Sequence, residues 1–356
     1  MNLSDKSFFT SKLMHWNILH NGRKMPWKGE KNPYRIWLSE IILQQTRVEQ
    51  GLDYYNRFIK KYPTIQQLAG APETEIFKLW EGLGYYTRCR NLIATARDIT
   101  GRLKGRFPED YADILRLKGV GPYTAAAIAS FAYDLPYAVV DGNVYRVLSR
   151  YFGISTAIDT SEGKKYFAAL ASDLLDRSAP GLYNQGIMDL GATICKPVPL
   201  CADCPLQKKC KAYKTDMINA YPVKEKKPAR KVRWLYYFIA EYENRLLIKK
   251  REGKDIWQNL HEFVLVENDR ELDNTELSQS TILQKMAGKK PVILDISEAY
   301  VQHLTHQTIK GRFIHVKLVK KPQLAGYRLE ARSSILKLAF PKYITGYFKD
   351  SRVLMG

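Results

Sequence analysis

The chain has 356 residues, of which 45% are hydrophobic, and a formal net charge of +20. This length predicts about two domains, and the apolar fraction is too high for a disordered chain. The basic excess favours a polyanionic partner, with nucleic acid ahead of an anionic membrane surface. There is no run of about 18 apolar residues and no signal-peptide order in residues 1–16, so we expect no membrane segment and a cytoplasmic protein with reduced cysteines.

The chain from Pro33 to about Tyr221 has the pattern of a helical region. Apolar residues recur every three or four positions in IWLSEIILQQTRVEQGLDYYNRFI, TEIFKLWEGLGYY and SEGKKYFAALASDLLDRS. Short breakers that contain proline or glycine separate these runs. We therefore predict a series of helices that ends at a cysteine-rich segment.

The segment LKGVG, residues 117–121, places two glycines directly before the alanine-rich run PYTAAAIASFA. Glycine allows a tight turn and close approach of another backbone, and the helix start that follows presents N–H groups to an anion. In a chain this basic a DNA phosphate is the simplest anion, although glycine pairs of this kind also occur as plain turns. Farther along, Asp141 precedes a new helix, which is the usual place of an N-cap.

Four of the five cysteines lie within sixteen positions, namely Cys195, Cys201, Cys204 and Cys210, whereas Cys89 stands alone. In a reducing compartment, four thiolates this close together predict a metal or iron–sulfur site rather than disulfides. The spacing by itself leaves a tetrahedral zinc ion open as well as an iron–sulfur cluster.

The segment KEKKPARKVR, residues 224–233, carries six basic residues and one acid around a proline, and we predict a linker there. After it, WLYYFIAEYENRLLIKKRE predicts two strands on either side of Glu243 and Asn244, and RFIHVKLV predicts a third strand. A smaller α+β domain is therefore expected in the C-terminal part of the chain.

Six segments occur in an order that resembles the helix–hairpin–helix DNA glycosylases, and among them the adenine DNA glycosylases of the MutY type. They are LSEIILQQTRVEQ, WEGLGYYTRCRNL, LKGVGPYTAAAIASFA, VDGNVYRVLSR, NQGIMDLGATIC and the cysteine cluster, and they cover nearly all of residues 25–215. The resemblance implies a mainly α glycosylase domain with an iron–sulfur loop over residues 1–223. The linker at 224–233 and a Nudix-like α+β domain over residues 234–356 would follow.

The implied reaction is removal of adenine mispaired with 8-oxoguanine or guanine. It needs an acid to protonate the departing base and a carboxylate to stabilise the positive sugar. By resemblance Glu40 is the acid, and its apolar neighbours in IWLSEIIL are expected to raise its pKa by desolvation. Asp141 would be the ionised carboxylate, with Asn143 and Tyr123 orienting the carboxylate or a water.

Tyr123 also bears on whether the enzyme cuts the DNA strand. It stands where the related endonuclease III type has a lysine nucleophile, and the next lysine in the chain is Lys164. A phenol cannot form the Schiff base that leads to strand cleavage. The resemblance therefore implies a glycosylase without lyase chemistry.

The same resemblance assigns further residues to DNA and to the base, which must leave the duplex to be reached. They are the wedge candidates Gln45 and Tyr85, the adenine-pocket candidates Trp27, Leu43 and Gln185, and the hairpin residues Lys118, Gly119 and Gly121, which would hold phosphates. For Trp27 and Leu43, ordinary core packing is the alternative.

In the C-terminal domain the resemblance implies recognition of 8-oxoguanine. Leu304-Thr305-His306 stands where the family has Phe-Ser-His, so Thr305 and His306 would contact the oxidised base or a phosphate, and leucine removes the aromatic contact. No clustered carboxylates of the Nudix hydrolase type occur here, so we expect no pyrophosphate hydrolysis.

The resemblance also implies that the four clustered cysteines hold a [4Fe–4S] cluster that braces a basic loop against phosphate. The interval between Cys195 and Cys201 is one residue shorter than the family's. This difference bears on how the cluster would be held.

The sequence thus predicts a monomeric, nucleoid-associated adenine DNA glycosylase that acts on double-stranded DNA and binds no membrane. One alternative is an endonuclease III-like glycosylase and lyase for oxidised pyrimidines. Tyr123 and the presence of a second domain argue against it. The other is a non-catalytic DNA-binding protein that keeps the iron–sulfur scaffold. The presence of both Glu40 and Asp141 speaks against it.

Overall fold

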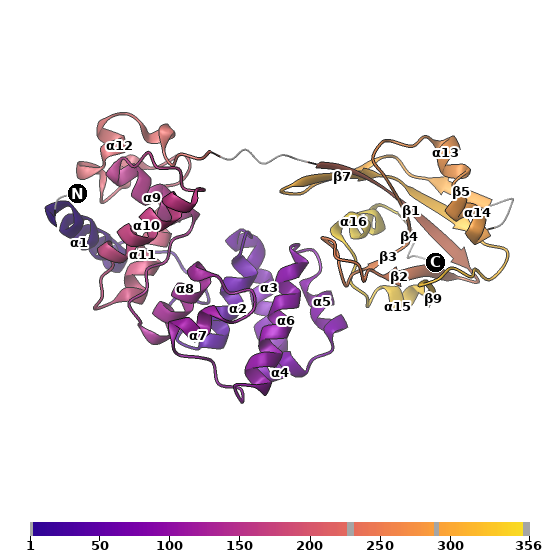
Figure 1. Cartoon of the computed structure of the whole chain (residues 1–356), viewed down its shortest axis with the longest axis horizontal. Helices are drawn as coiled ribbons and strands as arrows, with labels where there is room; N and C mark the ends of the chain where they lie inside the picture. The colour runs from indigo at the N-terminus through magenta and orange to yellow at the C-terminus, as the bar shows by residue number, and fades with distance from the viewer. Residues whose placement is uncertain (1–2, 226–230, 288–291, 352–356) are drawn as a thin grey trace. The chain divides into compact units, whose positions relative to one another are not determined.

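The computed structural model describes residues 3–225, 231–287 and 292–351, so residues 226–230 of the expected linker lie outside the described part. Contacts divide the chain into two compact units (Figure 1). Unit 1 is Met1–Ala69 with Ala94–Lys227, and unit 2 is Gly70–Ile93 with Pro228–Gly356. None of the helices in the described ranges is both long and apolar enough to cross a membrane.

The regular elements of unit 1 are all helical within the described residues, as the periodicity predicts. Its elements are α1 (Leu3–Leu19), α2 (Pro33–Leu43), α3 (Val48–Lys61), α4 (Ile65–Gly70), the second half of α6 (Tyr86–Gly101), α7 (Tyr111–Leu115), α8 (Pro122–Tyr133), α9 (Gly142–Phe152), α10 (Ser161–Leu174), α11 (Pro180–Thr193), α12 (Lys211–Lys214) and the 3-10 turns η1 (Cys201–Asp203), η2 (Gln207–Lys209) and η3 (Ile218–Ala220). α5 (Glu73–Trp80) and the first half of α6 belong to unit 2.

Helix α2 is buried on nearly all sides. It starts at Pro33, whose missing N–H costs nothing at this position, and the Asn32 side chain accepts hydrogen bonds from the first free amides. Every residue from Ile36 to Ile42 is buried, and α2 packs against α3 and the alanine-rich α8. Small side chains on α8 let the two helices approach closely, so a polar side chain on α2 is held inside the unit.

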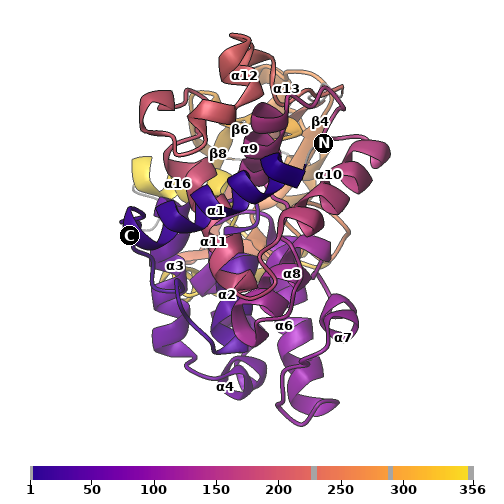
Figure 2. The same ribbon diagram turned by 90° about the vertical axis from the view of Figure 1, so that its left-hand side faces the viewer.

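The second core of unit 1 lies between α1, α8, α9, α10 and α11. α1 packs along α11 (Figure 2), and Phe9, Phe167 and Tyr183 fill the space between these helices. This packing fixes the positions of α9 and α11, which both contribute residues to the cavity described below.

Unit 2 contains a nine-stranded sheet, counted over its described residues, with β1 (Lys231–Tyr242) at the centre. β1 pairs in parallel with β7 (Gln307–Gly311) and then β8 (Phe313–Lys317), and antiparallel with β4 (Val264–Asn268) and β2 (Arg245–Lys250). The remaining strands are β3 (His261–Glu262) and β9 (Arg328–Ala331) on β2, β5 (Val292–Ile296) on β8, and β6 (Tyr300–His303) on β7.

The three predicted strands are confirmed as β1, β2 and β8, and β1 begins at Lys231, within the range expected for the linker. Gly311 is the last residue of β7 and has φ +152°, and a Cβ there would lie 1.8 Å from the carbonyl oxygen of Leu235. Glycine is therefore required where β1 passes from one parallel neighbour to the next.

Helices cover both faces of the sheet. α13 (Asn274–Ser278) and α14 (Thr281–Ala287) pack on the face that carries Tyr236 and Phe238. On the other face α16 (Lys342–Asp350), which follows α15 (Arg332–Ile335), stacks Tyr347 on Phe313 with ring centroids 4.0 Å apart. The C-terminal part is thus a sheet-containing domain, in agreement with the predicted fold class at that level.

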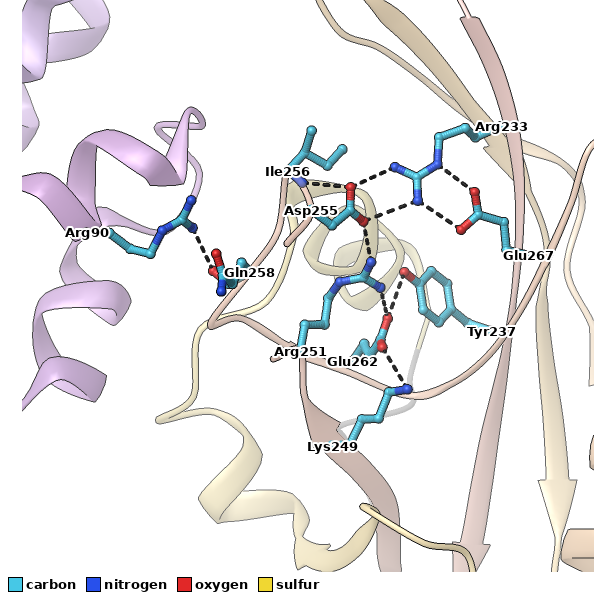
Figure 3. A network of polar contacts seen from close by, with 10 residues as sticks. All are labelled: Arg90, Arg233, Tyr237, Lys249, Arg251, Asp255, Ile256, Gln258, Glu262 and Glu267. Carbon is cyan, nitrogen blue, oxygen red and sulfur yellow. Dashed lines mark hydrogen bonds and ion pairs between the residues drawn. The ribbon is translucent and has the colours of Figure 1, made fainter. Parts of the chain in front are cut away.

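A chain of alternating charges fixes the segment between β2 and β3 (Figure 3). Arg233 on β1 contacts Asp255 at 2.9 Å and Glu267 at 2.7 Å. Asp255 also pairs with Arg251, whose other arm reaches Glu262. Each carboxylate in this chain faces at least one guanidinium, which is how a partly buried charge network is stabilised.

The segment between β2 and β3 also contacts Gly70–Ile93, the stretch from much earlier in the sequence that belongs to unit 2. Arg90 Nη1 on α6 donates to the carbonyl oxygen of Gln258 at 3.2 Å (Figure 3), and the backbone N–H of Phe340 donates to Glu81 at 2.8 Å. Gly70–Ile93 is therefore joined to the C-terminal sheet by polar contacts within one unit.

Glu262→Gln is expected to destabilise unit 2 strongly. Glu262 is 2% exposed and faces both Arg251 and Lys249, so the amide would leave two cations without their shared counter-charge. Removing one partner of a buried ion pair costs about 3–5 kcal/mol. Urea unfolding measures this loss, and Glu330→Gln, which breaks a more exposed pair with Arg328, should cost much less. Equal losses would contradict the importance of the buried charge.

Candidate active site

A cavity of about 490 Å³ lies in unit 1, lined by α2, α8, α9, α11 and the segments on either side of α2. Its lining includes eight residues singled out from the sequence, namely Trp27, Glu40, Leu43, Gln45, Tyr123, Asp141, Asn143 and Gln185. These side chains come from segments far apart in the chain, and the fold gathers them around one space.

Glu40 is the most buried titratable group of the cavity, with 6% of its surface exposed. Burial raises the pKa of Glu40 from its ordinary value of 4.5 to about 7. A hydrogen bond from the Tyr123 hydroxyl offsets part of this rise, and the Asp141 carboxylate adds to it. The direction expected from the apolar neighbours of Glu40 is confirmed, because α2 removes the carboxyl from water.

Asp141 is the N-cap of α9, as its position before a helix suggested. Its Oδ1 accepts a hydrogen bond from the backbone N–H of Val144 at 2.7 Å, and its Oδ2 accepts one from Asn143 Nδ2 at 2.9 Å. Burial raises the pKa of Asp141, while these two hydrogen bonds favour the carboxylate and limit the rise. The two carboxyl groups of the cavity therefore have different environments. Glu40 is largely desolvated, whereas Asp141 accepts hydrogen bonds that favour its charged form.

Tyr123 stands in the first turn of α8 and faces the same carboxyl groups. Burial raises the pKa of Tyr123 well above its ordinary value, and the charges of Glu40 and Asp141 add to the rise. The hydroxyl lies 4.0 Å from Sδ of Met188 on α11. It is therefore a neutral hydrogen-bond donor in this site.

Asn143 is positioned by a close approach of α11. A Cβ on Gly191 would lie 2.6 Å from the Cβ of Asn143, so only glycine lets the two helices meet here. Arg146 Nη2 donates to Asn143 Oδ1 at 2.8 Å and to the Gly191 carbonyl at 2.7 Å, and its Nε donates to the Cys195 carbonyl at 2.7 Å. The start of α9 is thus connected to the cysteine segment.

The adenine-pocket candidates pack as well as line the cavity. Trp27 meets Tyr55 edge to face, with ring centroids 5.2 Å apart. Leu43 lies against Gly51 of α3, where a Cβ would come within 2.7 Å of Leu43 Cδ2. Trp27 and Leu43 therefore both pack against neighbouring residues and line the cavity, so the two roles are compatible.

Several lining residues were not singled out from the sequence. They are Arg23, Met25, Ile36, Ser39, Gln44, Thr46, Val48, Phe131, Gly142 and Met188. Helical spacing gives a signal for Met188, which lies one turn after Gln185 on α11. Arg23 has no such signal, because a single arginine in an irregular segment of a basic chain does not stand out.

The glycine hairpin leads into α8 as expected. Gly119 has φ +82°, a conformation that glycine adopts without strain, and Thr95 Oγ1 fixes the turn by donating to the Lys118 carbonyl at 2.9 Å. Gly121 is the N-cap of α8 and supplies no side-chain cap. It has φ −98°, and a Cβ on it would meet nothing within 4 Å, so this fold itself does not require glycine there.

The two wedge candidates share an unusual backbone conformation. Gln45 has φ +55° and Tyr85 has φ +50°, which costs a residue with a Cβ about 1–3 kcal/mol. Gln45 lines the cavity, whereas Tyr85 belongs to unit 2 and is 40% exposed. Its hydroxyl makes a hydrogen bond with the hydroxyl of Thr305.

Thr305 and His306 lie in the turn between β6 and β7, and both are exposed. The turn is closed by a hydrogen bond from the Leu304 N–H to the Gln307 carbonyl at 2.8 Å. The structure thus places these two residues with Tyr85 in unit 2, and not with the residues that line the cavity of unit 1.

The four clustered cysteines line a second, apolar cavity of unit 1. The buried Arg150 donates to the Lys196 carbonyl at 2.6 Å, and its Nη1 lies 3.6 Å from Cys195 Sγ. Burial raises the pKa of Cys204 to about 12, so this thiol needs a strongly positive partner in order to ionise. In the described ranges, no three His, Cys, Asp or Glu side chains are arranged to hold one metal ion.

Comparison with known proteins adds a family context. Residues 38–172 match the HhH-GPD superfamily of base excision DNA repair proteins. The adenine DNA glycosylase of Buchnera aphidicola subsp. Baizongia pistaciae is 37% identical over 79% of this chain and 82% of that protein. The adenine DNA glycosylase of Mus musculus is 41% identical over 59% of this chain and 43% of that protein.

Two solved structures share the fold of the helical part. A thermostable thymine-DNA glycosylase is 32% identical with a TM-score of 0.55, and covers 60% of this chain and 98% of its own. Endonuclease III in a non-covalent complex with DNA is 22% identical with a TM-score of 0.51, again over 60% of this chain and 98% of its own. At that identity the second likeness concerns the fold alone.

Glu40→Gln is expected to change the pH dependence of stability. The Glu40 pKa is about 7 in the folded protein and about 4.5 in the unfolded chain, so the folded state binds this proton more tightly. Stability is therefore lost as pH rises from about 4.5 to about 7, by roughly 3 kcal/mol. Glutamine has no charge to bury and escapes this loss.

Urea unfolding of both proteins at pH 5 and pH 8 measures the difference. The variant should gain stability relative to the parent at pH 8 and show little gain at pH 5. Asp141 is present in both proteins, so its own titration largely cancels. The same pH dependence in both proteins would show that Glu40 is not buried in its charged form.

Proposed function

The chain belongs to the adenine DNA glycosylases of the HhH-GPD superfamily, and on this premise we propose that it hydrolyses the N-glycosidic bond of adenine mispaired with 8-oxoguanine or guanine in double-stranded DNA. The observation that carries the proposal is the pair Glu40 and Asp141 in one cavity, with the Glu40 pKa raised to about 7. A carboxyl with this pKa is protonated in about half of the molecules at neutral pH and can act as a general acid.

In the proposed reaction Glu40 donates its proton to a ring nitrogen of adenine. The electrons of the bond between the base and C1′ leave with the base, and the sugar becomes positively charged. Asp141 stabilises this sugar as a carboxylate, which the donors Val144 N–H and Asn143 Nδ2 maintain. A water then adds to C1′ and returns a proton to Glu40, and Tyr123 and Asn143 orient the carboxylate or the water.

The proposed enzyme leaves an abasic site and does not cut the strand. Strand cleavage by this superfamily's lyase route needs an amine that forms a Schiff base with C1′. No lysine is found among the described residues that line the cavity, and Tyr123 occupies the place next to the hairpin.

Contacts to DNA are proposed for the hairpin and the two wedge residues. The free amides at the start of α8, together with Lys118, Gly119 and Gly121, would hold a phosphate. Gln45 and Tyr85 would enter the stack that adenine leaves, and their left-handed backbones support this assignment because strain of this kind clusters at functional sites.

Recognition of the opposite base is proposed for unit 2. Its sheet with helices on both faces fits the Nudix-like fold that the resemblance implies. Thr305 would bond 8-oxoguanine through its hydroxyl, and His306 would contact the base or a phosphate. Their exposure in a turn, and the contact between Thr305 and Tyr85, support a shared role. We place the protein, as a monomer, with the DNA of the cytoplasmic nucleoid.

The four clustered cysteines would hold a [4Fe–4S] cluster. Four thiols around one apolar cavity are a donor set that suits such a cluster. The cluster would act as a structural brace when bound. Arg146 and Arg150 of α9 hold the start of this segment through its backbone carbonyls.

The decisive experiment uses a duplex with adenine opposite 8-oxoguanine and assays the adenine strand with and without hot alkali. We expect cleavage only after alkali, because base removal leaves an abasic site that alkali opens. Glu40→Gln should slow single-turnover excision by roughly 10²–10⁴-fold while duplex binding is retained. In the parent protein, the excision rate should fall as pH rises through about 7, since Glu40 then loses its proton.

The exposed Glu162→Gln on α10 is the matched control and should leave the rate unchanged. Cleavage without alkali would reveal a nucleophile and contradict the absence of lyase chemistry. A duplex with thymine opposite guanine and one with an oxidised pyrimidine test the specificities suggested by the structural relative and by the endonuclease III type. Excision of only those bases would overturn the substrate assignment, and no excision at all would favour a non-catalytic DNA-binding protein.

Gly121→Ser is expected to separate DNA binding from stability. The serine hydroxyl can cap the α8 amides, so the free energy of unfolding should change by only a few tenths of a kcal/mol. The new side chain occupies the place proposed for the phosphate, so affinity for the duplex should fall. Unfolding and duplex titration measure the two effects, and unchanged affinity would contradict the hairpin assignment.

A further inference from the structure

Asp189 on α11 is a fully buried carboxylate that the proposed reaction does not use. Its surface exposure is 0%, and it follows Met188, which lines the cavity. A charged group without water must be compensated by donors or cations, otherwise its burial is costly. The partners of Asp189 therefore show what the carboxylate holds in place.

Three donors converge on Asp189 from the segment between α1 and α2. Arg23 Nη1 donates to Oδ1 at 2.8 Å. Asn21 Nδ2 and Lys28 Nζ donate to Oδ2 at 2.8 Å and 3.1 Å. One carboxylate thus serves two cations, which retain 24% and 23% exposure at their side chains.

The segment that these donors belong to has little regular structure of its own. It runs as coil and turn from Asn21 to Asn32. Lys28 Nζ also donates to the Arg23 carbonyl at 3.1 Å, so the ammonium group links the segment to itself and to Asp189. Three residues of this segment line the cavity, namely Arg23, Met25 and Trp27.

Helix α11 also contributes to the lining of the same cavity. Gln185 and Met188 line it, and Asp189 lies at the next position. A second connection from the same helix supports the segment, because Asn17 of α1 donates to the Leu182 carbonyl at 2.8 Å and accepts from Asn21 at 2.7 Å. The cavity wall formed by Trp27 is therefore tied to α11 through polar groups.

We propose that Asp189 is a positioning residue for the base pocket. It fastens the segment Asn21–Lys28 to α11. Arg23 and Trp27 are thereby held beside the residues of α11 that line the cavity, where the base that has left the duplex would bind. The inference rests on the proposed function, since it assigns this cavity to a base. Asp189 does not touch the reacting atoms and acts through the wall that it holds.

The amide of Asp189→Asn would leave Arg23 and Lys28 side by side without their shared counter-charge. The two cations would repel each other and draw the segment toward solvent, and Trp27 would move with it. Misplacement of a pocket wall by about 1 Å can cost about 10²-fold in rate. Steps that involve the base in its pocket should suffer, while contacts of the hairpin with phosphate should not.

The test compares Asp189→Asn with Asp173→Asn, a variant of an exposed carboxylate that pairs with Lys6. Single-turnover excision from the duplex with adenine opposite 8-oxoguanine should be slower by about 10- to 100-fold in Asp189→Asn. It should be unchanged in Asp173→Asn. The fall of the rate as pH rises through about 7 should remain, because Glu40 keeps its surroundings.

Binding to two duplexes separates a positioning role from a general structural one. In a Glu40→Gln background, affinity for the adenine duplex should fall with Asp189→Asn, because the base is still attached. Affinity for a duplex with an abasic site, which has no base to place, should stay the same within error. An equal loss for both duplexes would show that Asp189 supports the DNA-binding surface as a whole and would overturn the proposal.

Lys28→Met provides a second variant that keeps the carboxylate paired with Arg23. It should slow excision less than Asp189→Asn, and the double variant should recover part of the rate that Asp189→Asn loses, because the unpaired ammonium is gone. If Asp189→Asn does not fold, Lys28→Met alone must still lower affinity for the adenine duplex more than for the abasic duplex. If Lys28→Met lowers affinity for the two duplexes equally, the proposal is overturned.

The result also separates this inference from the proposed function. A parent protein that excises adenine normally, with Asp189→Asn as fast as Asp173→Asn, would refute the positioning role alone. A parent protein that excises no adenine would refute the proposed function and the inference that rests on it.

Discussion

The burial of one carboxyl group on α2 is the constraint on which the site depends. Glu40 lies in a helix whose residues from Ile36 to Ile42 are all buried, packed against the small side chains of α8. A glutamate on the surface of an amphipathic helix would be ionised at neutral pH and could donate no proton. The apolar surroundings that make α2 a core helix are thus what raises the pKa of Glu40 to about 7.

The other polar groups of the cavity are held by contacts with segments far along the chain. Asn143, which supports Asp141, is fixed by the close approach of Gly191 and by Arg146. Arg146 in turn holds the first carbonyl of the cysteine segment. A change in that segment can therefore reach Asp141 through the first turn of α9, without any contact between the cysteines and the cavity.

Local pattern was enough to predict the direction of the Glu40 pKa, the cap formed by Asp141 and the strands β1, β2 and β8, because each depends on neighbours in sequence. Assigning roles to Trp27 or Tyr85 required a family resemblance. The function of Asp189 could not be predicted either way. Its partner Lys28 lies 161 positions earlier, and an aspartate in NQGIMDLGATIC does not show which distant cations reach it.

Adenine is a normal base, so under the proposed function a pocket for it cannot by itself separate damaged from undamaged DNA. Discrimination has to come from the opposite base and from the lower cost of extruding a mispaired one. The residues assigned to the opposite base, Thr305 and His306, belong to one unit, and Glu40 and Asp141 belong to the other. Contacts with the opposite base accelerate the reaction only if they form while adenine occupies its pocket, because only binding energy present in the transition state lowers the barrier. Helix α6 contributes residues to both units, so the two sets of residues are joined through one continuous helix.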